Sequence, residues 1–272
     1  MSRLAEYVES RELIANLTLR ELRGRYKRSA LGWTWSLLNP LSTVVTFSIV
    51  FAFFLQIKPP VGHPSGLHNF AVFLLCGLLP FNYLSNGMNG SADALLSNSN
   101  LIRKVYFPRE VLVVSTIGSL LVTMLVELSV LCVILLALGN MVLPWIPLLL
   151  VLVTIQTVFV LGIGLMLSVF NVYFRDVKHL IGISLQALFY SAPIVYPIKF
   201  VEDAAGRTSF PLLRVYTLNP LVRFVDAYRA VMYDLRFPAL SDVVYVTIWA
   251  VAMLTLGLLV FRRLDRRLAE EV

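Results

Sequence analysis

Charged side chains are scarce in this sequence, and the common motifs of enzymes are missing. Asp, Glu, Lys and Arg make up 14% of the 272 residues, whereas soluble domains carry about 25%. No Gly-Lys dipeptide occurs, which excludes a nucleotide-binding loop of the Gly-x4-Gly-Lys-Ser/Thr kind. A His-Glu-x-x-His motif, a Cys/His cluster and a Gly-x-Ser-x-Gly motif are absent as well. We therefore expect the chain to have no catalytic residues, no metal site and no cofactor of its own.

Cysteine is also rare, and the excess of positive charge is not arranged for nucleic acid. Cys76 and Cys132 both lie in apolar stretches, where we expect small buried residues rather than a disulfide pair. The formal net charge is +7, but the cations gather at the ends of apolar runs instead of along one face. This pattern favours membrane lipids as partners and gives no reason to expect nucleic acid.

Hydrophobic residues, by contrast, dominate the sequence. They make up 58% of the chain, and the mean hydropathy is +0.79. A helix that spans a bilayer needs about 20 apolar residues, and six windows qualify, at residues 41–57, 69–96, 111–138, 145–170, 180–196 and 243–261. The sequence thus predicts an all-α membrane protein with six transmembrane helices. Residues 1–272 form one membrane domain, with a cytoplasmic and interface region at 1–40, the spans within 41–261 and a cytoplasmic tail at 262–272.

The connections between these windows predict their orientation. Lys and Arg are frequent before the first window, after the second and fourth windows, and in the C-terminal tail. The connection after the first window has only Lys58, and residues 139–144 have no cation. Since cytoplasmic connections carry the excess of Lys and Arg, both termini are expected in the cytoplasm.

The cation-rich segment before the first window is predicted to be an amphipathic helix from about Thr18. Its apolar positions recur at helical spacing, at Leu19, Leu22, Tyr26 and Ala30. Its cations are Arg20, Arg23, Arg25, Lys27 and Arg28. Such a helix suits the headgroup layer of the bilayer, although a plain positively charged flank would explain the charge equally well. We expect Asn39 to cap the first span and Pro40 to stand in its first turn.

Residues 97–110 form an unusual cytoplasmic turn. One of Asn98, Ser99 and Asn100 is expected to cap a short helix, and Pro108 is expected to stop it. The turn has the apolar residues Leu101, Ile102, Val105, Tyr106 and Phe107, which would face water and mark a partner site. The alternative is that they dip into the lipid headgroups.

The segment after the fifth window alternates helix breakers with apolar residues. Pro193 and Pro197 should end or kink the fifth helix, and Asn219-Pro220 should start another. The apolar face of that helix comprises Leu221, Phe224, Val225, Tyr228 and Met232. These features favour re-entrant or interfacial outer helices, with an ordinary outer loop as the alternative.

Two features inside the windows have competing explanations. Glu127 is a carboxylate in the middle of an apolar run, which indicates either a functional group or a protonated residue at a helix contact. Gly162 and Gly164 are expected to permit close helix packing rather than to bind a phosphate.

Taken together, the motifs resemble those of ABC-2 type permeases that export polysaccharides such as O-antigen, teichoic acid and capsule. Arg25-Tyr-Lys-Arg-Ser-Ala-Leu-Gly-Trp-Thr-Trp-Ser-Leu-Leu-Asn-Pro40 resembles the opening motif of that family. Asn100-Leu-Ile-Arg-Lys-Val-Tyr-Phe-Pro-Arg109 resembles its coupling segment. Ala192-Pro-Ile-Val-Tyr-Pro197, Leu218-Asn-Pro220 and Tyr228-Arg229 match its outer region.

The resemblance implies a permease subunit in the plasma membrane of a bacterium. It would form a homodimer, bind two copies of a separate ATPase that holds ATP and Mg, and move a lipid-linked polymer outward along a seam between the protomers. An ABC-2 exporter of a smaller lipid or drug-like substrate, an ion-coupled carrier using Glu127 and Asp93, and a membrane scaffold are the alternatives.

The resemblance also assigns roles to residues. The coupling segment that contacts the ATPase would comprise Asn100, Leu101, Arg103, Lys104, Tyr106, Phe107 and Pro108. The cations at residues 20–28 would meet the anionic head of the lipid carrier. Aromatic rings pack on sugar C–H faces, so the candidates for the path are Phe73, Phe81, Tyr83, Phe189 and Tyr190, together with Glu127; each aromatic could instead face lipid or the core. The outer gate would comprise Pro193, Tyr196, Pro197, Asn219 and Pro220.

Overall fold

A computed structural model describes residues 11–26, 32, 34–54, 56, 60–105, 107–207 and 211–265 of the chain. Within these residues every regular element is a helix, which confirms the predicted all-α class. Four helical segments are long and apolar enough to cross a membrane. They are α4 (Phe70–Ala94), α6 (Glu110–Ala137), Leu143–Tyr173, which comprises η3 (Leu143–Trp145) and α7 (Ile146–Tyr173), and α12 (Leu240–Leu264). They match the windows predicted at 69–96, 111–138, 145–170 and 243–261.

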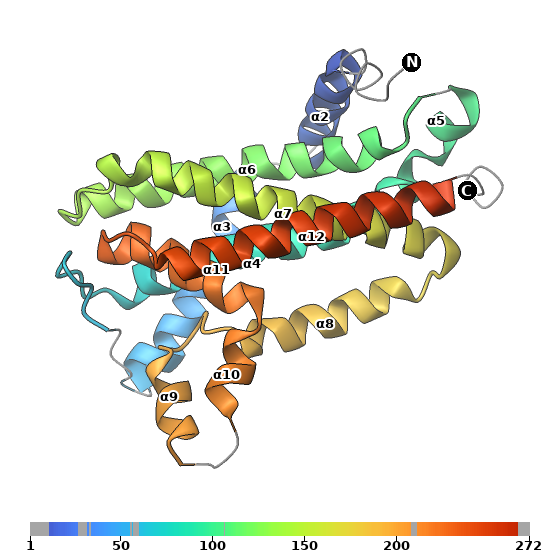
Figure 1. The fold of residues 1–272 in the computed structure, drawn as a ribbon. Helices are drawn as coiled ribbons and strands as arrows, with labels where there is room; N and C mark the ends of the chain where they lie inside the picture. The colour runs from blue at the N-terminus through green and yellow to red at the C-terminus, as the bar shows by residue number, and fades with distance from the viewer. Residues whose placement is uncertain are drawn as a thin grey trace.

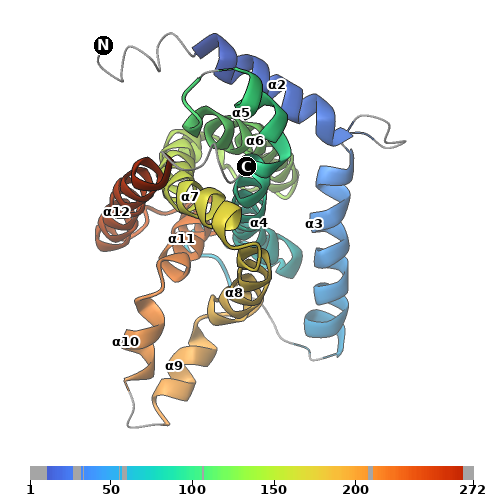
Figure 2. The same ribbon diagram turned by 90° about the vertical axis from the view of Figure 1, so that its right-hand side faces the viewer.

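These four helices form the bundle at the centre of the molecule (Figure 1), and Figure 2 views them nearly along their axes. Helix α4 begins where the side chain of Asn69 accepts a hydrogen bond from the backbone N–H of Val72 at 3.2 Å. Two buried amides of α7 then join it to α4. Gln156 donates to the carbonyl of Pro80 at 2.7 Å, and Asn171 donates to the carbonyl of Ala92 at 2.8 Å. These bonds give the apolar contact between α4 and α7 a fixed register.

Small residues allow α7 and α12 to approach closely. A Cβ atom on Gly162 would lie 2.3 Å from the backbone nitrogen of Leu254, and one on Gly257 would lie 2.2 Å from the carbonyl oxygen of Gly162. A Cβ atom on Gly164 would meet Ser91 of α4 at 2.4 Å. The prediction that Gly162 and Gly164 serve helix packing is therefore confirmed.

The remaining two predicted spans differ from the bundle helices. Helix α3 (Thr34–Phe47) continues as the π-helix η1 (Ser48–Phe54), and Figure 2 shows it lengthwise while the bundle is seen end-on, so it crosses the bundle steeply. Helix α8 (Val177–Ser191) has 15 residues and is shorter than the 20 or so needed for a span. It ends before Pro193, as the prolines predict. The count of six spans remains a prediction.

The predicted start of α3 is wrong. Helix α3 begins at Thr34 and Pro40 lies inside it, so Asn39 and Pro40 are not at its first turn. The apolar residues Trp35, Leu37 and Leu38 extend the helix upstream, and the missing N–H of Pro40 removes only one backbone bond.

The N-terminal helix α2 (Arg11–Tyr26) packs on α6. Its buried residues are Leu17 and Leu22, whereas Leu19 is 47% exposed. The predicted apolar stripe is therefore wrong at Leu19, and the helix begins before Thr18. The reason is the approach of α6, where Gly118 leaves room for the side chain of Thr18.

The segment after α8 has a buried part and a projecting part. Helix α11 (Pro220–Arg229) and the π-helix η4 (Ala230–Asp234) bury the face that was predicted, with Leu221, Phe224, Val225, Tyr228 and Met232 all at most 3% exposed. Helices α9 (Lys199–Ala205) and α10 (Leu212–Thr217) pack on each other and project from the bundle (Figures 1 and 2).

The loop before α4 is fastened to the end of η4. The hydroxyl of Tyr233 donates to the carbonyl of Pro60 at 3.0 Å and accepts from the backbone N–H of Asn69 at 3.3 Å. The hydroxyl of Ser65 donates to the carbonyl of Tyr233 at 2.6 Å. Two segments far apart in the sequence thus form one structure at this end of the bundle.

Candidate functional site

The predicted coupling segment contains a helix that is shorter than expected. Helix α5 (Ser99–Lys104) follows the 3-10 turn η2 (Leu96–Asn98) and ends before Val105, whose φ of −133° and ψ of 134° are extended. The prediction that Pro108 ends this helix is therefore wrong. Val105 is β-branched, a side-chain type that favours extended backbone over helix, so the chain leaves the helix before it reaches Pro108.

The apolar residues of this segment do not form one patch that faces water. Leu101, Ile102 and Phe107 are half-buried against the core, and Val105 is 53% exposed. Tyr106 lies outside the described residues, and Pro108 is half-buried. The exposed residues of α5 are Asn100, Arg103 and Lys104. A partner would therefore meet a mainly polar and cationic surface with Val105 beside it.

A hydrogen bond joins α2 to the start of α5. The guanidinium of Arg20 donates to the side-chain oxygen of Asn98, whose amide donates to the carbonyl of Ala94 at 2.9 Å. Asn98 is the cap position of α5, so the predicted cap residue is correct in place, but its side chain bonds to neighbouring elements instead of the helix N-terminus. The bond couples the position of α2 to that of α5.

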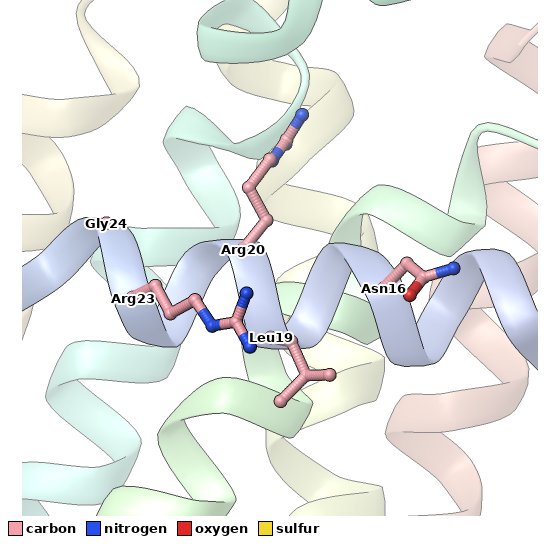
Figure 3. Close-up of a pocket in the computed structure, with 5 residues that line it drawn as sticks. All are labelled: Asn16, Leu19, Arg20, Arg23 and Gly24. Carbon is pink, nitrogen blue, oxygen red and sulfur yellow. The ribbon is translucent and has the colours of Figure 1, made fainter.

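The outward face of α2 is open and cationic. Arg20 and Arg23 are exposed, and with Asn16, Leu19 and Gly24 they line a shallow cavity of about 430 Å³ (Figure 3). The side chain of Arg25 and all of Lys27 and Arg28 lie outside the described residues. Two of the five predicted cations are thus placed together on one surface.

Polar contacts also hold the other helix ends together at this end of the bundle. Arg109 donates to the backbone carbonyl of Asp265 at 2.7 Å and to its carboxylate at 3.0 Å. The hydroxyl of Tyr173 donates to the carbonyl of Leu264 at 3.1 Å. Lys178 of α8 and Asp93 of α4 form an ion pair at 2.8 Å. A force on the α5–α6 turn would therefore act on the ends of α6, α7 and α12 together.

The aromatic candidates for a path are mostly inside the protomer. Phe73 and Tyr83 are each 3% exposed, and Tyr83 donates to the hydroxyl of Thr157 at 3.1 Å. Phe81 is buried against the half-buried Phe189, with ring centroids 5.2 Å apart, and Tyr190 is 63% exposed. Glu127 is half-buried on α6. Contact with a polymer stays a prediction for these residues, and Tyr190 is the most accessible of them.

The residues predicted as an outer gate lie where α8 ends and α11 begins. The side chain of Asn219 accepts from the backbone N–H of Leu221 at 3.0 Å, and Pro220 occupies the first turn of α11, so this predicted helix start is confirmed. Pro193 is buried and Pro197 half-buried. The hydroxyl of Tyr196 donates to the carbonyl of Tyr190 at 2.7 Å. That these residues open and close a gate remains a prediction.

Arg229 organises the region where α8 ends and α11 begins, and it is not among the predicted site residues. It is 7% exposed and donates to the carbonyls of Pro193, Ile194 and Phe73, at 2.7 Å to Ile194 and 3.3 Å to Phe73. Its guanidinium carbon lies 3.6 Å from the centre of the Phe73 ring. The chain is no longer helical beyond α8, so the carbonyls of Pro193 and Ile194 lack helical partners, and Arg229 supplies the missing donors. The signal in the sequence was a cation inside an apolar helix face.

The matches with known proteins agree with this architecture. The chain is 31% identical over 251 residues to the O-antigen export system permease protein RfbA of Myxococcus xanthus, which covers 90% of this chain and 92% of that protein. A Klebsiella pneumoniae protein of the same name is 26% identical over 262 residues, or 95% of this chain and 94% of that protein. The polysialic acid transport protein KpsM of Escherichia coli is 25% identical over 257 residues, with coverages of 90% and 91%.

A family match extends over residues 12–233 and carries the description ABC-2 type transporter. The match begins at residue 12 within α2 and includes three of the four apolar helical segments, all except α12. It also includes the helices after α8 as far as Tyr233. The protein is therefore a multi-pass membrane protein that belongs to the ABC-2 type transporter family.

Proposed function

We propose that this chain is the permease subunit of an ATP-driven exporter that moves a lipid-linked polysaccharide across the plasma membrane. The main support is the similarity to O-antigen and polysialic acid transport proteins along at least nine-tenths of the chain. The sequence has no nucleotide-binding loop, which supports a separate ATPase as the source of energy. One specific finding disfavours the ion-coupled carrier, because Asp93, one of its two carboxylates, is paired with Lys178.

The ATPase would contact the exposed residues of α5 and Val105. Lys104 is exposed, and Val105 is 53% exposed. The contacts from Arg20 to Asn98 and from Arg109 to Asp265 would pass its movement to α2, α6 and α12. We further propose that two protomers pair and that both termini are cytoplasmic. A two-fold seam would provide space for a polymer that a single tightly packed bundle does not.

Removal of the gene for this chain from its bacterium tests the central proposal. Surface polymer should disappear, and lipid-linked polymer should accumulate inside the cell. A strain whose partner ATPase has lost its nucleotide-binding lysine should show the same phenotype. Normal surface polymer without this chain would refute the proposal.

The ATPase contact is tested by charge insertion. Val105→Asp should weaken recovery of the ATPase with the tagged permease, because it places an acid in the contact. Val61→Asp is a matched control, since Val61 is 46% exposed in the loop before α4. Equal recovery with both variants would contradict the assignment.

Orientation is tested with single cysteines in a chain without Cys76 and Cys132. Cysteines at Val105 and at Met141, which is 59% exposed, should be labelled from the inside and the outside respectively. Labelling of both from the same side would refute the topology.

A further inference from the structure

Helix α4 has one narrow accessible face, and that face is polar. Most of this helix is buried in the protomer. From Val72 to Ala94, the residues that are not buried are Asn82, Ser85, Asn86, Asn89, Gly90 and Asp93. Positions 82, 86, 89 and 93 follow helical spacing, so they share one side of the helix. We call Asn82, Ser85, Asn86, Asn89 and Asp93 the α4 polar face.

This face does not have the composition of a surface in contact with lipid. The accessible residues of α12 are mainly apolar, among them Ile248 at 62%, Val251 at 57% and Leu259 at 54% exposure. An amide without a hydrogen-bond partner is costly in hydrocarbon. Helix α4 is the least hydrophobic of the four apolar helical segments. The α4 polar face is therefore better suited to water or a polar ligand than to lipid.

The amides of this face have open hydrogen-bonding positions. Among the described residues, no hydrogen-bond partner is found for the side chains of Asn82 and Asn86. Asn89 uses one N–H to reach the carbonyl of Ser85 at 2.9 Å, which leaves its carbonyl oxygen open. The charge of Asp93 is balanced by Lys178 at 2.8 Å. The face is therefore nearly neutral and is rich in groups that both donate and accept.

Contacts with α8 bound the face at its two ends. The ion pair between Asp93 and Lys178 lies at the cytoplasmic end, and the contact of Phe81 with Phe189, at 5.2 Å between ring centroids, lies toward the outer end. Between these contacts the exposed residues of α8 are both polar and apolar: His179, Leu180, Gly182, Ile183, Ser184, Gln186 and Ala187. Asn82 and Asp93 are 11 positions apart, so the face extends along about 16 Å of helix.

We propose that the α4 polar face binds the hydroxyl groups of the polymer during its passage, an inference that rests on the proposed function. A sugar hydroxyl donates and accepts, as a primary amide does, so the two surfaces are complementary. A single neutral hydrogen bond contributes little net free energy, and a conducting path needs binding that is weak enough for release. A row of neutral amides meets both requirements, whereas the charged surface of α2 would hold an anion more firmly.

Cysteine accessibility in permeabilised cells tests the exposure of this face and its occupant. Asn86→Cys and Asn89→Cys, in a chain without Cys76 and Cys132, should react with a membrane-impermeant methanethiosulfonate, because a thiol ionises only in water. Val133→Cys on α6 and Leu259→Cys on α12 are controls for lipid exposure, since these residues are 65% and 54% exposed. They should remain unmodified.

Reaction at Asn86→Cys should be slower in cells that make the polymer than in cells without the first glycosyltransferase of its synthesis. No reaction at either α4 position would show that a second copy of the chain or lipid covers the face, and would overturn the proposal. Reaction at the same rate with and without polymer would overturn it as well. Neither result affects the proposed function, which is tested separately by loss of export on removal of the chain.

Substitution tests the chemistry. Asn86→Leu with Asn89→Leu should lower the rate of polymer export about tenfold, through the loss of two or more hydrogen bonds. Asn86→Gln with Asn89→Gln should retain most of the export rate, because both amides remain. Thr255→Leu, at an exposed position of α12, is the matched polar-to-leucine control. Equal export by the leucine and glutamine pairs, at equal amounts of protein in the membrane, would refute the role of the amides.

Discussion

Replacing Gly162 with alanine should separate α7 from α12. The new Cβ atom would lie 2.3 Å from both the backbone nitrogen of Leu254 and the carbonyl carbon of Met253. Non-bonded carbon atoms prefer about 3.5–4.0 Å, so the helices must move apart by about 1 Å. Backbone atoms cannot rotate away as the end of a long side chain can. The substitution therefore disturbs the packing of the whole pair.

The expected loss of stability follows from two opposing contributions. Overpacking a tight contact typically costs about 1–3 kcal/mol. Alanine is favoured over glycine inside a helix by about 1 kcal/mol. The net loss is then about 0–2 kcal/mol, which for a chain of this size lowers Tm by up to about 8 °C.

Cys76 provides the assay because its side chain is 0% exposed. A maleimide dye that fluoresces on reaction with thiols should report unfolding of the purified protein when Cys132 has been replaced by alanine. Gly182→Ala is the matched control, since no heavy atom lies within 4 Å of the added Cβ, and it should keep or raise Tm. Gly162→Ala with the same Tm as Gly182→Ala would refute the close contact of α7 and α12.

Three further substitutions test buried polar contacts. Arg229→Lys should lower Tm by more than Gly162→Ala, because the ammonium group cannot replace all the donors to the three carbonyls and each charged hydrogen bond contributes about 1.5–3 kcal/mol; an unchanged Tm would contradict that arrangement. Gln156 contacts the carbonyl of Pro80 and the hydroxyl of Tyr228, which donates to it at 2.8 Å. Gln156→Leu should lower the free energy of unfolding by about 1–3 kcal/mol for each of these partners left unpaired. It should lower stability more than Tyr228→Phe, and the reverse order would count against the network. Asn98→Ala should release α2 and accelerate tryptic cleavage after Arg20, while the free energy of unfolding falls by only about 1 kcal/mol. Cleavage at the wild-type rate would show that Asn98 does not hold α2.

The length and apolar character of the bundle helices could be predicted from the sequence because both depend on the bilayer. Runs of about 20 apolar residues are required wherever a helix spans the membrane, so α4, α6, α7 and α12 were located to within a few residues. The buried face of α11 was also predictable, since its apolar residues follow helical spacing. Gly162 and Gly164 were recognised for a related reason, because small residues in spans serve packing.

The remaining details depend on which element packs against which. Leu17 and Leu19 are chemically alike, and only the direction of approach of α6 buries the first and exposes the second. Helix α5 has six residues, too few for its own propensity to fix its end. The partners of Arg229 are backbone carbonyls, and carbonyls leave no mark in a sequence. Phe73 and Tyr83 were offered as path residues because aromatic character does not tell whether a ring faces a polymer or the core.

The fastening of the loop before α4 to Tyr233 has a consequence for biosynthesis. Pro60 and Ser65 leave the ribosome long before residue 233 is made, 168 positions after Ser65. Until then the carbonyl of Pro60 and the backbone N–H of Asn69 lack the partner that they have in the finished protein. The start of α4 is therefore completed late in synthesis, after the sequence of α6, α7 and α8 has been made. A nascent chain that stops before Tyr233 would carry all the sequence of this loop without the contacts that shape it.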